Sequence, residues 1–354
     1  MTGPGPQPLQ TRKEEEAEVP FIPPDILEER RLEKIPSSLH TIKAYRFRPS
    51  KNSWKHALTS GLEVDPGKER ALEEKKAPCT QLRIITWNVD MVSDHAEDRL
   101  TAALRHIEEE VLKGKEGEAP EPCCILLQEV RASLLPYLLR DEWVRRWFVV
   151  TPFTQDKWPE GAYYGCVTLI ARSLNIAECD ILHYGVTTMQ RTALCVKVKL
   201  QFPGTQEKAV ISIVNTHLES LPEGSMARPI QLEMCSRFLR VEGVQGGVIA
   251  GDMNAIGPED AMIGKDLGLR DSWRKGETDA GKTWGYQGQN TGNFPANRLD
   301  KIFYLPAMGY KVDEPKRIGV GLKVKESSNQ ALWVSDHYGL ETTLRMLKPR
   351  SNSS

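Results

Sequence analysis

The sequence lacks the long apolar run that a membrane-spanning helix requires, since no stretch approaches roughly 18 consecutive apolar residues. The amino terminus, MTGPGPQPLQ, has no apolar centre, so we expect neither a secretory signal nor a membrane partner. An excess of one charge is also lacking: 47 Lys and Arg against 48 Asp and Glu leave a net charge of −1. This balance excludes a strongly basic wrapper of nucleic acid, but it leaves a local basic groove open.

CxxC pairs are missing as well, and the seven cysteines form an odd set. Cys123 and Cys124 are neighbours inside an apolar stretch, and no group of Cys and His has the spacing of a zinc site. These features exclude a disulfide framework. They predict reduced thiols that fill the core of a protein from a reducing compartment, the nucleus and/or the cytoplasm.

The chain of 354 residues is long enough to bury a large core. Residues 1–39 are rich in proline and in blocks of charge, which predicts a disordered tail. In residues 40–81, Tyr45, Phe47 and Trp54 predict a short docked segment, and a charged linker follows. Residues 82–345 have the regular patterns of one catalytic-size domain, and 346–354 are a second tail.

From residue 82 onward, patterns of buried strands are interspersed with helical patterns. Strands are predicted at 82–87, 123–127, 165–171, 192–200, 210–215, 247–251 and 299–304 and after Ser335, and helices at 97–112, 132–147 and 226–241. Within 192–200, apolar residues alternate with Lys197 and Lys199, which predicts one buried and one solvent-facing side. Many strands with interspersed helices indicate an α/β fold with large sheets.

Polar side chains stand in or beside the ends of these strands. They are Asn88, Asp90, Gln128, Glu129, Asn215, His217, Glu219, Ser220, Asp252, Asn254, Asp300, Ser335, Asp336 and His337. Ligands and catalytic groups gather at strand ends in α/β folds. Carboxylate and amide oxygens without a cysteine suit a hard cation such as Mg²⁺ or Mn²⁺. A single Asp at a strand end is commonly a turn former or a cap, but that reading would have to hold at five separate strand ends.

In this order, the polar groups resemble the motifs of the endonuclease/exonuclease/phosphatase superfamily of metal-dependent phosphoesterases. The matching segments are TWNVD (86–90), LQEV (127–130), NTHLES (215–220), GDMN (251–254), RLDKI (298–302) and SDHYGL (335–340). Within the superfamily, the chain is most similar to the tyrosyl-DNA phosphodiesterase 2 family. That likeness rests on THLES, TMQRTALCV (188–196), KTW (282–284) and RLDKIFY.

The resemblance implies a two-sheet α/β sandwich in four layers, α/β/β/α, with the site at one sheet edge. It implies Mg²⁺, with Mn²⁺ as an alternative, held mainly by Glu129 with Asp336 and Asn88 near the ion. It also implies that Asp252 and Asn254 position and deprotonate the attacking water. In the same way, it implies that His217 and His337 contact the scissile phosphate and that Asp300 holds the imidazole of His337. Asp90 occupies a motif position without an assigned role.

The resemblance also implies a substrate and a partner, DNA with a blocked 5′ end, such as a 5′-phosphotyrosyl adduct removed in DNA repair. Ser220, Trp284, Arg191 and Arg228 are the candidate substrate contacts, and Arg298 is a further candidate for phosphate. The alternative to a substrate contact is a surface salt bridge for each of the three arginines and a place in the hydrophobic core for Trp284. Tyr163 and Tyr164 are possible platforms for a base, but we favour an ordinary strand start. His106 and His183 are read as structural.

Two departures bear on the substrate. The related family has basic residues where this sequence has Pro222 and Ile256. Arg228 could replace one of them. Two alternatives to DNA hydrolysis therefore stay open, an RNA- or small-phosphoester-directed hydrolase and a non-catalytic relative that binds nucleic acid or protein.

Overall fold

The structure, a computed structural model, describes residues 36–62, 78–90, 92–115, 117–288, 294–306, 309–324 and 332–348. The proline-rich tail up to residue 35, the charged linker and the last six residues lie outside this range.

Two large sheets form the centre of the molecule. The strands are β1 (Ser38–Thr41), β2 (Tyr45–Arg48), β3 (Ser53–His56), β4 (Gln81–Asn88), β5 (Cys123–Arg131), β6 (Phe148–Thr151), β7 (Tyr164–Ala171), β8 (Asn175–His183), β9 (Thr192–Gln201), β10 (Lys208–His217), β11 (Val244–Asp252), β12 (Arg270–Asp271), β13 (Asp300–Tyr304), β14 (Tyr310–Val312), β15 (Lys316–Ile318), β16 (Lys323–Val324), β17 (Leu332–Trp333) and β18 (Gly339–Met346). One sheet has the order β1-β8-β9-β10-β11-β13-β12, and the other has the order β14-β18-β4-β5-β7-β6-β2-β3, with β15 also paired to β18. β16 and β17 form a separate hairpin.

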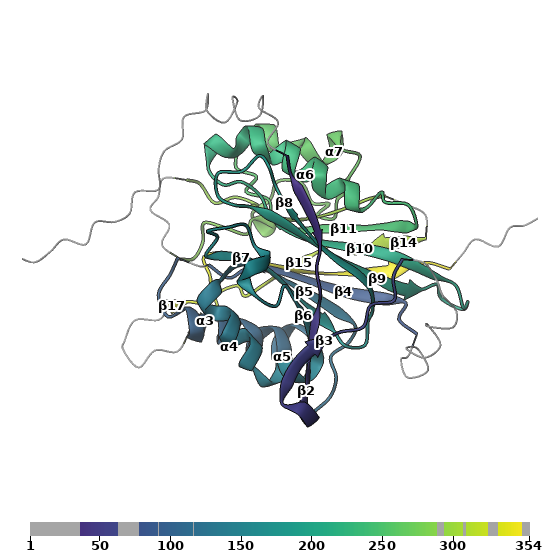
Figure 1. Cartoon of the computed structure of the whole chain (residues 1–354). Helices are drawn as coiled ribbons and strands as arrows, with labels where there is room; N and C mark the ends of the chain where they lie inside the picture. Colours follow the sequence, from purple (N-terminus) through teal and green to yellow (C-terminus); the bar gives the residue numbers. More distant parts are fainter. Residues whose placement is uncertain are drawn as a thin grey trace, which may run out of the picture.

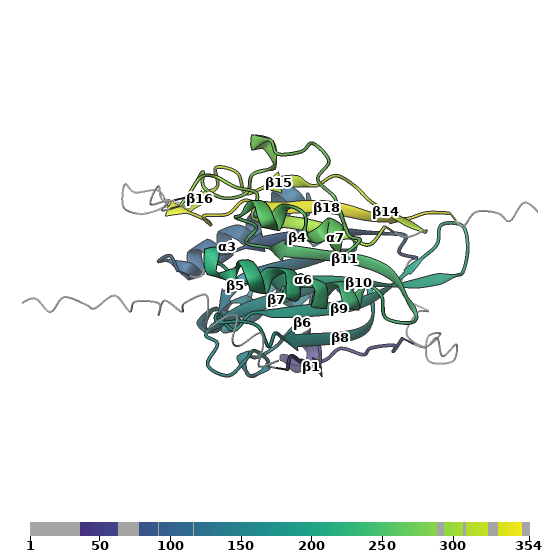
Figure 2. The same ribbon diagram turned by 90° about the horizontal axis from the view of Figure 1, so that it is seen from above.

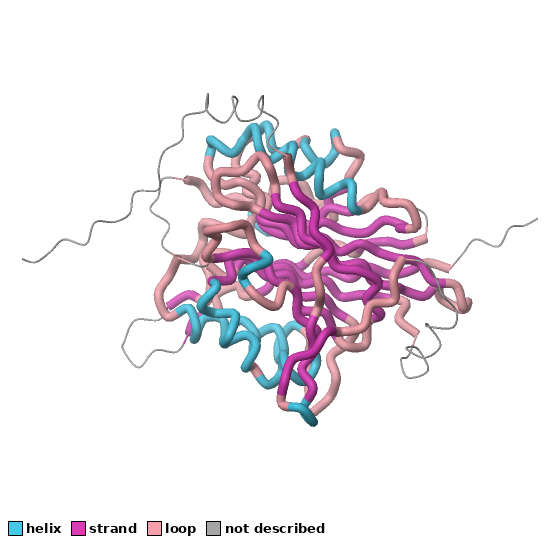
Figure 3. The backbone as a smooth tube through the Cα atoms, viewed as in Figure 1, coloured by secondary structure: helices cyan, strands magenta, loops and turns pink. Residues whose placement is uncertain are grey.

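Helices cover the outer faces of this sandwich. They are α3 (Ala96–His106), continued by a π-helical turn η2 (Ile107–Val111), then α4 (Leu135–Arg140), α5 (Glu142–Trp147), α6 (Ala227–Phe238) and α7 (Ile263–Asp266). Short 3₁₀ turns are η1 (Pro49–Lys51), η3 (Ala132–Leu134), η4 (Gln155–Lys157), η5 (Pro222–Met226), η6 (Pro258–Ala261) and η7 (Asp279–Gly281). α6 and α7 lie over one sheet, and α3, α4 and α5 lie under the other (Figure 1). The tube in Figure 3 shows the same four layers, α/β/β/α, which the resemblance implied.

The main core fills the space between the two sheets, and alternation along the strands explains it. Leu194, Val196 and Val198 of β9 point into this core together with Ile211 and Ile213 of β10. The alternate residues of the same strands face α6, where a second apolar cluster lies. In the part of the chain that the structure describes, no helix is both long and apolar enough to cross a bilayer.

The outer side of β9 does not face solvent, so the prediction for Lys197 and Lys199 was wrong. Both side chains are buried. The Lys197 ammonium group bonds to Glu178 Oε2 at 2.6 Å and to Asp180 Oδ2 at 2.8 Å, both from the neighbouring β8. The alternation is therefore real, but a buried ion-pair cluster takes the place of water.

Residues 38–56 belong to both sheets. β1 adds to the edge of one sheet by pairing with β8, and β2 adds to the other by pairing with β6. The purple segment in Figure 1 runs from one layer to the other, and Figure 2 shows it at the edge of the molecule beside β8. The aromatic residues of this segment contact rings outside it, such as Trp54 with Phe153, whose centroids are 5.7 Å apart.

Candidate active site

Two parallel strand pairs end at the same end of the sandwich. β4 and β5 run in parallel and bring Asn88 opposite Gln128. β10 and β11 do the same in the other sheet and bring His217 opposite Asp252. Because the carboxyl ends of parallel strands meet at one edge, polar residues far apart in the sequence converge there.

Asp252 lies at the centre of this group. Its Oδ2 accepts a hydrogen bond from Asn88 Nδ2 at 3.0 Å and lies 3.3 Å from His217 Nε2 and 3.7 Å from His337 Nε2. Its Oδ1 accepts from the backbone N–H of Asn254 at 2.9 Å. Burial disfavours the charged carboxylate, but the nearby imidazoles and the Asn254 N–H outweigh it and hold the pKa of Asp252 well below its usual value.

Asp300 holds the imidazole of His337, as the resemblance implied. Asp300 starts β13 opposite Asp252, and its Oδ2 lies 2.7 Å from His337 Nδ1. Burial opposes the charged imidazole, but the charges of Asp300, Asp336 and Asp252 together raise the pKa of His337 well above its usual value. His337 therefore presents a protonated Nε2 toward Asp252.

Arg191 sets the tautomer of His217. Arg191 Nη1 donates to His217 Nδ1 at 2.8 Å, so the ring proton of His217 sits on Nε2, on the side of Asp252. The Arg191 guanidinium is buried and lies 5.5 Å from the centroid of the Tyr164 ring. Arg191 is thus placed behind the imidazole of His217 and not in a solvent salt bridge.

A bulge in β5 brings Glu129 to the site. Adjacent residues of a regular strand face opposite sides, yet both Gln128 and Glu129 reach inward. The register of β5 against β7 shifts between Leu127 and Val130, and Glu129 has a φ of 57°. Its Oε1 accepts from Asn88 Nδ2 at 3.1 Å and lies 3.9 Å from His217 Nε2. A bulge re-aims a side chain in this way, and such strain gathers at functional sites.

Asp336 is near enough to Glu129 for the two charges to interact. Trp284 Nε1 donates to Asp336 Oδ2 at 2.9 Å. Burial raises the pKa of Asp336 to about 6, and the charges of Asp90 and Glu129 add to the effect against that of His337. A hard divalent cation at these two carboxylates would relieve the repulsion that Glu129 exerts on Asp336.

A second donor set is also buried there. One ligand atom from each of Asp252, Asp300 and His337 lies within 4.8 Å of the others, so this group could bind a metal ion. Asp300 Oδ1 is buried with no hydrogen-bond partner. However, the facing atoms of Asp300 and His337 already bond to each other. We therefore prefer the pair Glu129 and Asp336 as the metal donors.

A cavity of about 250 Å³ opens beside these groups. Its described lining consists of Glu129, His217, Ser220, Leu221, Asp252, Asn254, Ile256, Trp284, Phe294, Pro295, Asn297, Leu299, Asp336 and His337. Ser220 Oγ donates to Asn254 Oδ1 at 3.0 Å, so the two residues form one polar corner. The structure thus gathers Ser220 and Trp284 with the candidate catalytic and metal residues.

Two predicted residues, Asp90 and Arg228, lie elsewhere. Asp90 pairs with the buried Arg99 at 2.6 Å and accepts from Ser93 Oγ, so it fixes the loop after β4. Arg228 is fully buried, and its guanidinium makes a two-pronged contact with Asp260 at 2.7 and 2.9 Å. It does not face the cavity, and we leave it out of the proposed substrate contacts.

The remaining candidates keep structural contacts. Arg298 pairs with Asp271 at 2.7 Å. His106 Nε2 accepts from the backbone N–H of Gly319 at 3.1 Å. The side chain of Tyr163 is exposed, and Tyr163 does not line the cavity.

Sequence reasoning did not assign Glu219 a role, although it stands in the THLES motif. This buried carboxylate accepts hydrogen bonds from Thr187 Oγ1 at 2.7 Å, from Thr188 N at 2.9 Å and from Met189 N at 3.0 Å. It therefore shapes the loop that leads to Arg191. Its position in the motif was the signal, but its partners are about 30 residues away in the sequence.

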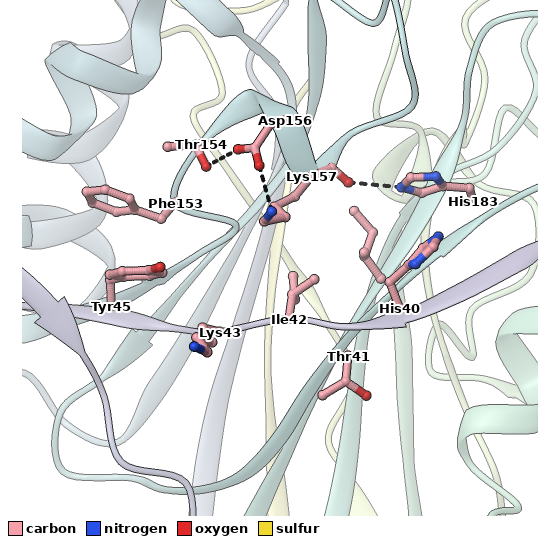
Figure 4. Close-up of a pocket in the computed structure, with 11 residues that line it drawn as sticks. His40, Thr41, Ile42, Lys43, Tyr45, Phe153, Thr154, Asp156, Lys157 and His183 are labelled. Carbon is pink, nitrogen blue, oxygen red and sulfur yellow. Dashed lines mark hydrogen bonds and ion pairs between the residues drawn. The ribbon is translucent and has the colours of Figure 1, made fainter.

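A second cavity, of about 490 Å³, lies where the chain crosses between the sheets (Figure 4). Tyr45 stacks on Phe153 with centroids 4.4 Å apart, and Lys157 pairs with Asp156 at 2.6 Å. His183 Nε2 donates to the Lys157 carbonyl at 2.9 Å, and burial lowers the pKa of His183. The described lining includes none of the candidate catalytic residues, and the contact of His183 fits its structural interpretation.

Comparison with known proteins gives two findings, a family profile and a set of similar folds. Residues 85–337 match the profile described as the Endonuclease/Exonuclease/phosphatase family. The fold is similar to a crystal structure of D. rerio TDP2 complexed with single strand DNA product, at 22% identity and a TM-score of 0.58 over 75% of this chain and 99% of that chain. It is also similar to TDP2 from C. elegans, at 19% identity and a TM-score of 0.56, over 79% of this chain and 80% of that chain. A third similar fold is the human Nocturnin catalytic domain, at 16% identity and a TM-score of 0.51. The match covers 76% of this chain and 95% of that chain. At these identities the likeness shows the fold. No curated protein sequence matches the chain.

Proposed function

The chain belongs to the Endonuclease/Exonuclease/phosphatase family, and from this premise we propose that it is a metal-dependent phosphodiesterase that acts on nucleic-acid ends. The family is the one inferred from the motifs. The observation that carries the proposal is the position of Asp252 between two imidazole Nε2 atoms, beside Glu129. Phosphoryl transfer needs positioning and charge stabilisation at one place, and this group offers both.

The metal would be held by Glu129 and Asp336, with Asn88 donating to Glu129. A bound Mg²⁺ or Mn²⁺ supplies positive charge to the phosphate oxygens as negative charge develops there. Asn88 Oδ1 already accepts from the backbone N–H of Asp90 at 3.0 Å. Asn88 therefore orients the carboxylate and anchors the loop.

The two histidines contact the phosphate from opposite sheets. His217 ends β10 with its Nε2 proton set by Arg191, and His337 precedes β18 with its charge set by Asp300. Both donors point to the space around Asp252. They stabilise the non-bridging oxygens of the scissile phosphate in the transition state.

Asp252 and Asn254 orient the attacking water. The ionised Asp252 accepts a hydrogen bond from the water, and the backbone N–H of Asn254 fixes the carboxylate. Because the pKa of Asp252 is far below neutrality, positioning is its main contribution. A tyrosine leaving group, with a pKa of about 10, needs little protonation as it departs.

The finer proposal for the substrate is DNA with a 5′-phosphotyrosyl block, in DNA repair. Its support is the motif set shared with the tyrosyl-DNA phosphodiesterase 2 family and the TDP2 structures among the similar folds. A reducing compartment, nuclear or cytoplasmic, suits the seven free cysteines, six of which are buried.

A substrate panel tests this function. The purified protein is incubated with a 5′-tyrosyl DNA oligonucleotide, an abasic duplex, poly(A) RNA and an inositol phosphate, with Mg²⁺ or with EDTA. We expect metal-dependent release of tyrosine that leaves a 5′-phosphate. Cleavage of another member alone would keep the chemistry and reject the tyrosyl substrate. A folded protein that cleaves none of them would reject the enzymatic proposal.

A further inference from the structure

A segment with charge of one sign precedes the catalytic part of the chain. Residues 36–62 contain five Lys and Arg and no Asp or Glu, although the whole chain has a net charge of −1. Four of these five basic residues belong to the hairpin of β2, η1 and β3 at the bottom of Figure 1. The segment lies before residues 85–337, which match the family profile, and it contributes nothing to the described lining of the catalytic cavity. The catalytic arrangement therefore does not account for this concentration of positive charge.

Alternation along the two strands of the hairpin separates aromatic from basic side chains. Phe47 of β2 pairs with Trp54 of β3, and the centroids of their rings are 5.7 Å apart. Trp54 also contacts Phe153, so the aromatic face holds the hairpin against the domain. Adjacent residues of a strand point to opposite faces, so Arg46 and Lys55, which pair across the two strands, share the other face.

The pair of Arg46 and Lys55 places two positive charges opposite each other, an arrangement that destabilises a strand pair. In the described part of the structure, Arg46 Nε is buried without a hydrogen-bond partner. Arg172, just after β7, approaches the same strand, because its Nη2 donates to the Phe47 carbonyl at 2.6 Å. Burial lowers the pKa of Arg172, and the charge of Arg46 adds to the effect. An anion that binds here would relieve the repulsion among these groups.

The cationic surface consists of six basic side chains, Arg46, Arg48, Lys51, Lys55, Arg145 and Arg172. Arg145 of α5 belongs to it because its guanidinium carbon lies 4.6 Å from the centroid of the Phe47 ring. Arg48, Lys51 and Lys55 are exposed, and the other three are partly exposed. Other arginines pair with carboxylates, as Arg83 does with Glu121 at 2.6 Å, whereas none of the six has an acidic partner among the described residues.

The chemistry of the cationic surface fits phosphate groups. Four of its six members are arginines, and a guanidinium group can donate two parallel hydrogen bonds to phosphate oxygens. The aromatic rings of the hairpin pack on each other and on Phe153, so they do not offer a stacking platform for the bases of a single strand. Contacts to phosphates alone bind a duplex without reading its sequence.

We propose that the cationic surface binds the phosphate backbone of a nucleic-acid duplex, at a place separate from the catalytic cavity. Electrostatic binding of this kind brings a protein to nucleic acid and lets it move along the duplex. It needs neither a metal ion nor turnover. The proposal therefore stands or falls separately from the proposed phosphodiesterase activity.

Binding to a DNA duplex tests the cationic surface. A fluorescently labelled duplex of about 20 base pairs, with blunt and unblocked ends, is titrated with the whole protein in EDTA, and anisotropy reports binding. We expect the affinity to fall by about 10²- to 10³-fold between 50 and 200 mM salt, as four to six phosphate contacts require. An absence of binding at 50 mM salt, or an affinity that does not change with salt, would overturn the proposal.

A double variant locates the binding on the hairpin. Arg48→Glu with Lys55→Glu should weaken duplex binding by at least about tenfold at 50 mM salt and reduce the slope of log affinity against log salt by about 2. Lys55→Glu also places a carboxylate opposite Arg46, so the midpoint of thermal unfolding should not fall. Wild-type binding by this folded variant would overturn the proposal.

The control makes the same change of charge elsewhere. Lys265→Glu with Lys316→Glu alters two exposed positions on α7 and β15, and it should weaken duplex binding by less than about threefold. Equal losses in both double variants would show that net charge, and not the cationic surface, is responsible, and would overturn the proposal.

Competition identifies the kind of partner. An unlabelled duplex should displace the labelled duplex better than a single strand of the same length or a polyglutamate peptide of equal charge. Better displacement by the single strand or by the peptide would overturn the assignment to a duplex.

Turnover of a small substrate keeps this inference apart from the catalytic one. The variant with Arg48→Glu and Lys55→Glu should hydrolyse the p-nitrophenyl ester of thymidine 5′-phosphate with the kcat and KM of the wild type. A loss of kcat in this folded variant would show that the hairpin acts on the catalytic site and would overturn its separate role. A wild-type protein that binds the duplex but hydrolyses no phosphodiester would support the cationic surface and reject the phosphodiesterase alone.

Discussion

At the scale of single residues, Asp252 is the candidate catalytic residue on which four groups converge, namely Asn88, His217, His337 and the Asn254 N–H. Asp252→Asn removes the charge that orients water and pairs with the imidazoles, while it keeps the shape. We expect turnover to fall by about 10²- to 10⁴-fold and substrate binding to remain. Steady-state kinetics and calorimetry measure the two effects. Asp266→Asn, at an exposed position, is the control and should change neither quantity. Loss of substrate binding in D252N would instead assign Asp252 a structural or metal-ligand role.

The two carboxylate sets can be told apart by metal binding. If Glu129 holds the ion, Glu129→Gln should weaken Mn²⁺ binding by more than about tenfold, as followed by electron paramagnetic resonance. Asp300→Asn should leave Mn²⁺ binding nearly unchanged and lower kcat, because Asp300 acts on His337. The reverse pattern would place the ion in the group of Asp252, Asp300 and His337.

Lys301 gives a pH-dependent stability. Burial lowers the pKa of Lys301 to about 8, and Arg298 adds to the shift. In the unfolded chain its pKa is about 10.4, so between pH 8 and 10.4 the unfolded state binds more protons and stability rises with pH. Lys301→Met should therefore raise the free energy of unfolding at pH 7 by up to about 3 kcal/mol, and this gain should shrink by pH 10. Urea unfolding at both pH values measures it, and a gain independent of pH would contradict the assignment.

At the scale of elements, β10 and β11 approach each other closely beside the site. Gly251 has a φ of 146°, and a Cβ atom there would lie 1.9 Å from the Thr216 carbonyl oxygen. Gly251→Ala should destabilise the protein by about 3 kcal/mol or more, since the strand pair that aligns His217 with Asp252 must separate.

Gly243→Ala is the matched control for this strand pair. Gly243 also has a positive φ, of 80°, but a Cβ atom there meets nothing within 4 Å. We expect only the backbone strain of about 1–2 kcal/mol. Chemical denaturation compares the two variants, and equal losses would show that close approach is not the cause at Gly251.

The elements also show how far the sequence could be read. Alternation and apolar runs predicted the strands that carry the catalytic residues, because those strands are long and strongly patterned. β8 was missed, since AECD within it mixes polar and apolar residues without a clear period. The helix at 132–147 is divided into α4 and α5 at Asp141, whose side chain accepts from the Val144 N–H. Such local breaks depend on contacts that a periodic pattern does not contain.

The same limit applies to the site. The strand ends predicted the convergence of His217 with Asp252, because β10 and β11 run parallel and end together. Asp300 joins them because β13 runs antiparallel to β11 and starts opposite Asp252, and His337 bonds to Asp300. The sequence could not show the inward direction of Arg228, because its partner Asp260 lies 32 residues away and both are buried. Nor could it show that Ile256 faces the cavity, which depends on the loop that Asp260 holds.

At the scale of the whole molecule, a buried polar link joins the two sheets near the site. Asn215 of β10 accepts from Gln128 Nε2 at 2.8 Å and donates to the Leu127 and Val167 carbonyls at 3.2 and 3.1 Å. Asn215→Leu should lower stability by about 1–3 kcal/mol, because these partners lose their bonds. It should also lower kcat in the fully folded protein, since His217 is two residues away.

The control for Asn215 lies on the same strand. Ser212 bonds to the Phe238 carbonyl at 2.9 Å on the side of α6, away from the other sheet. Ser212→Ala should lower stability and leave kcat unchanged, as measured by thermal unfolding and kinetics. A loss of kcat in both variants would indicate that general loosening of β10, and not the link between the sheets, is responsible.

The division of the site between two sheets has a further consequence. Asp252, His217 and Asp300 come from one sheet, whereas Asn88 and Glu129 come from the other, and His337 directly precedes its strand β18. Neither sheet holds the whole set of candidate catalytic residues. A shift of one sheet relative to the other by about the width of one side chain would therefore abolish activity while every strand stayed paired. The catalytic rate should therefore fall when the two sheets become slightly misaligned, before spectroscopy detects any unfolding.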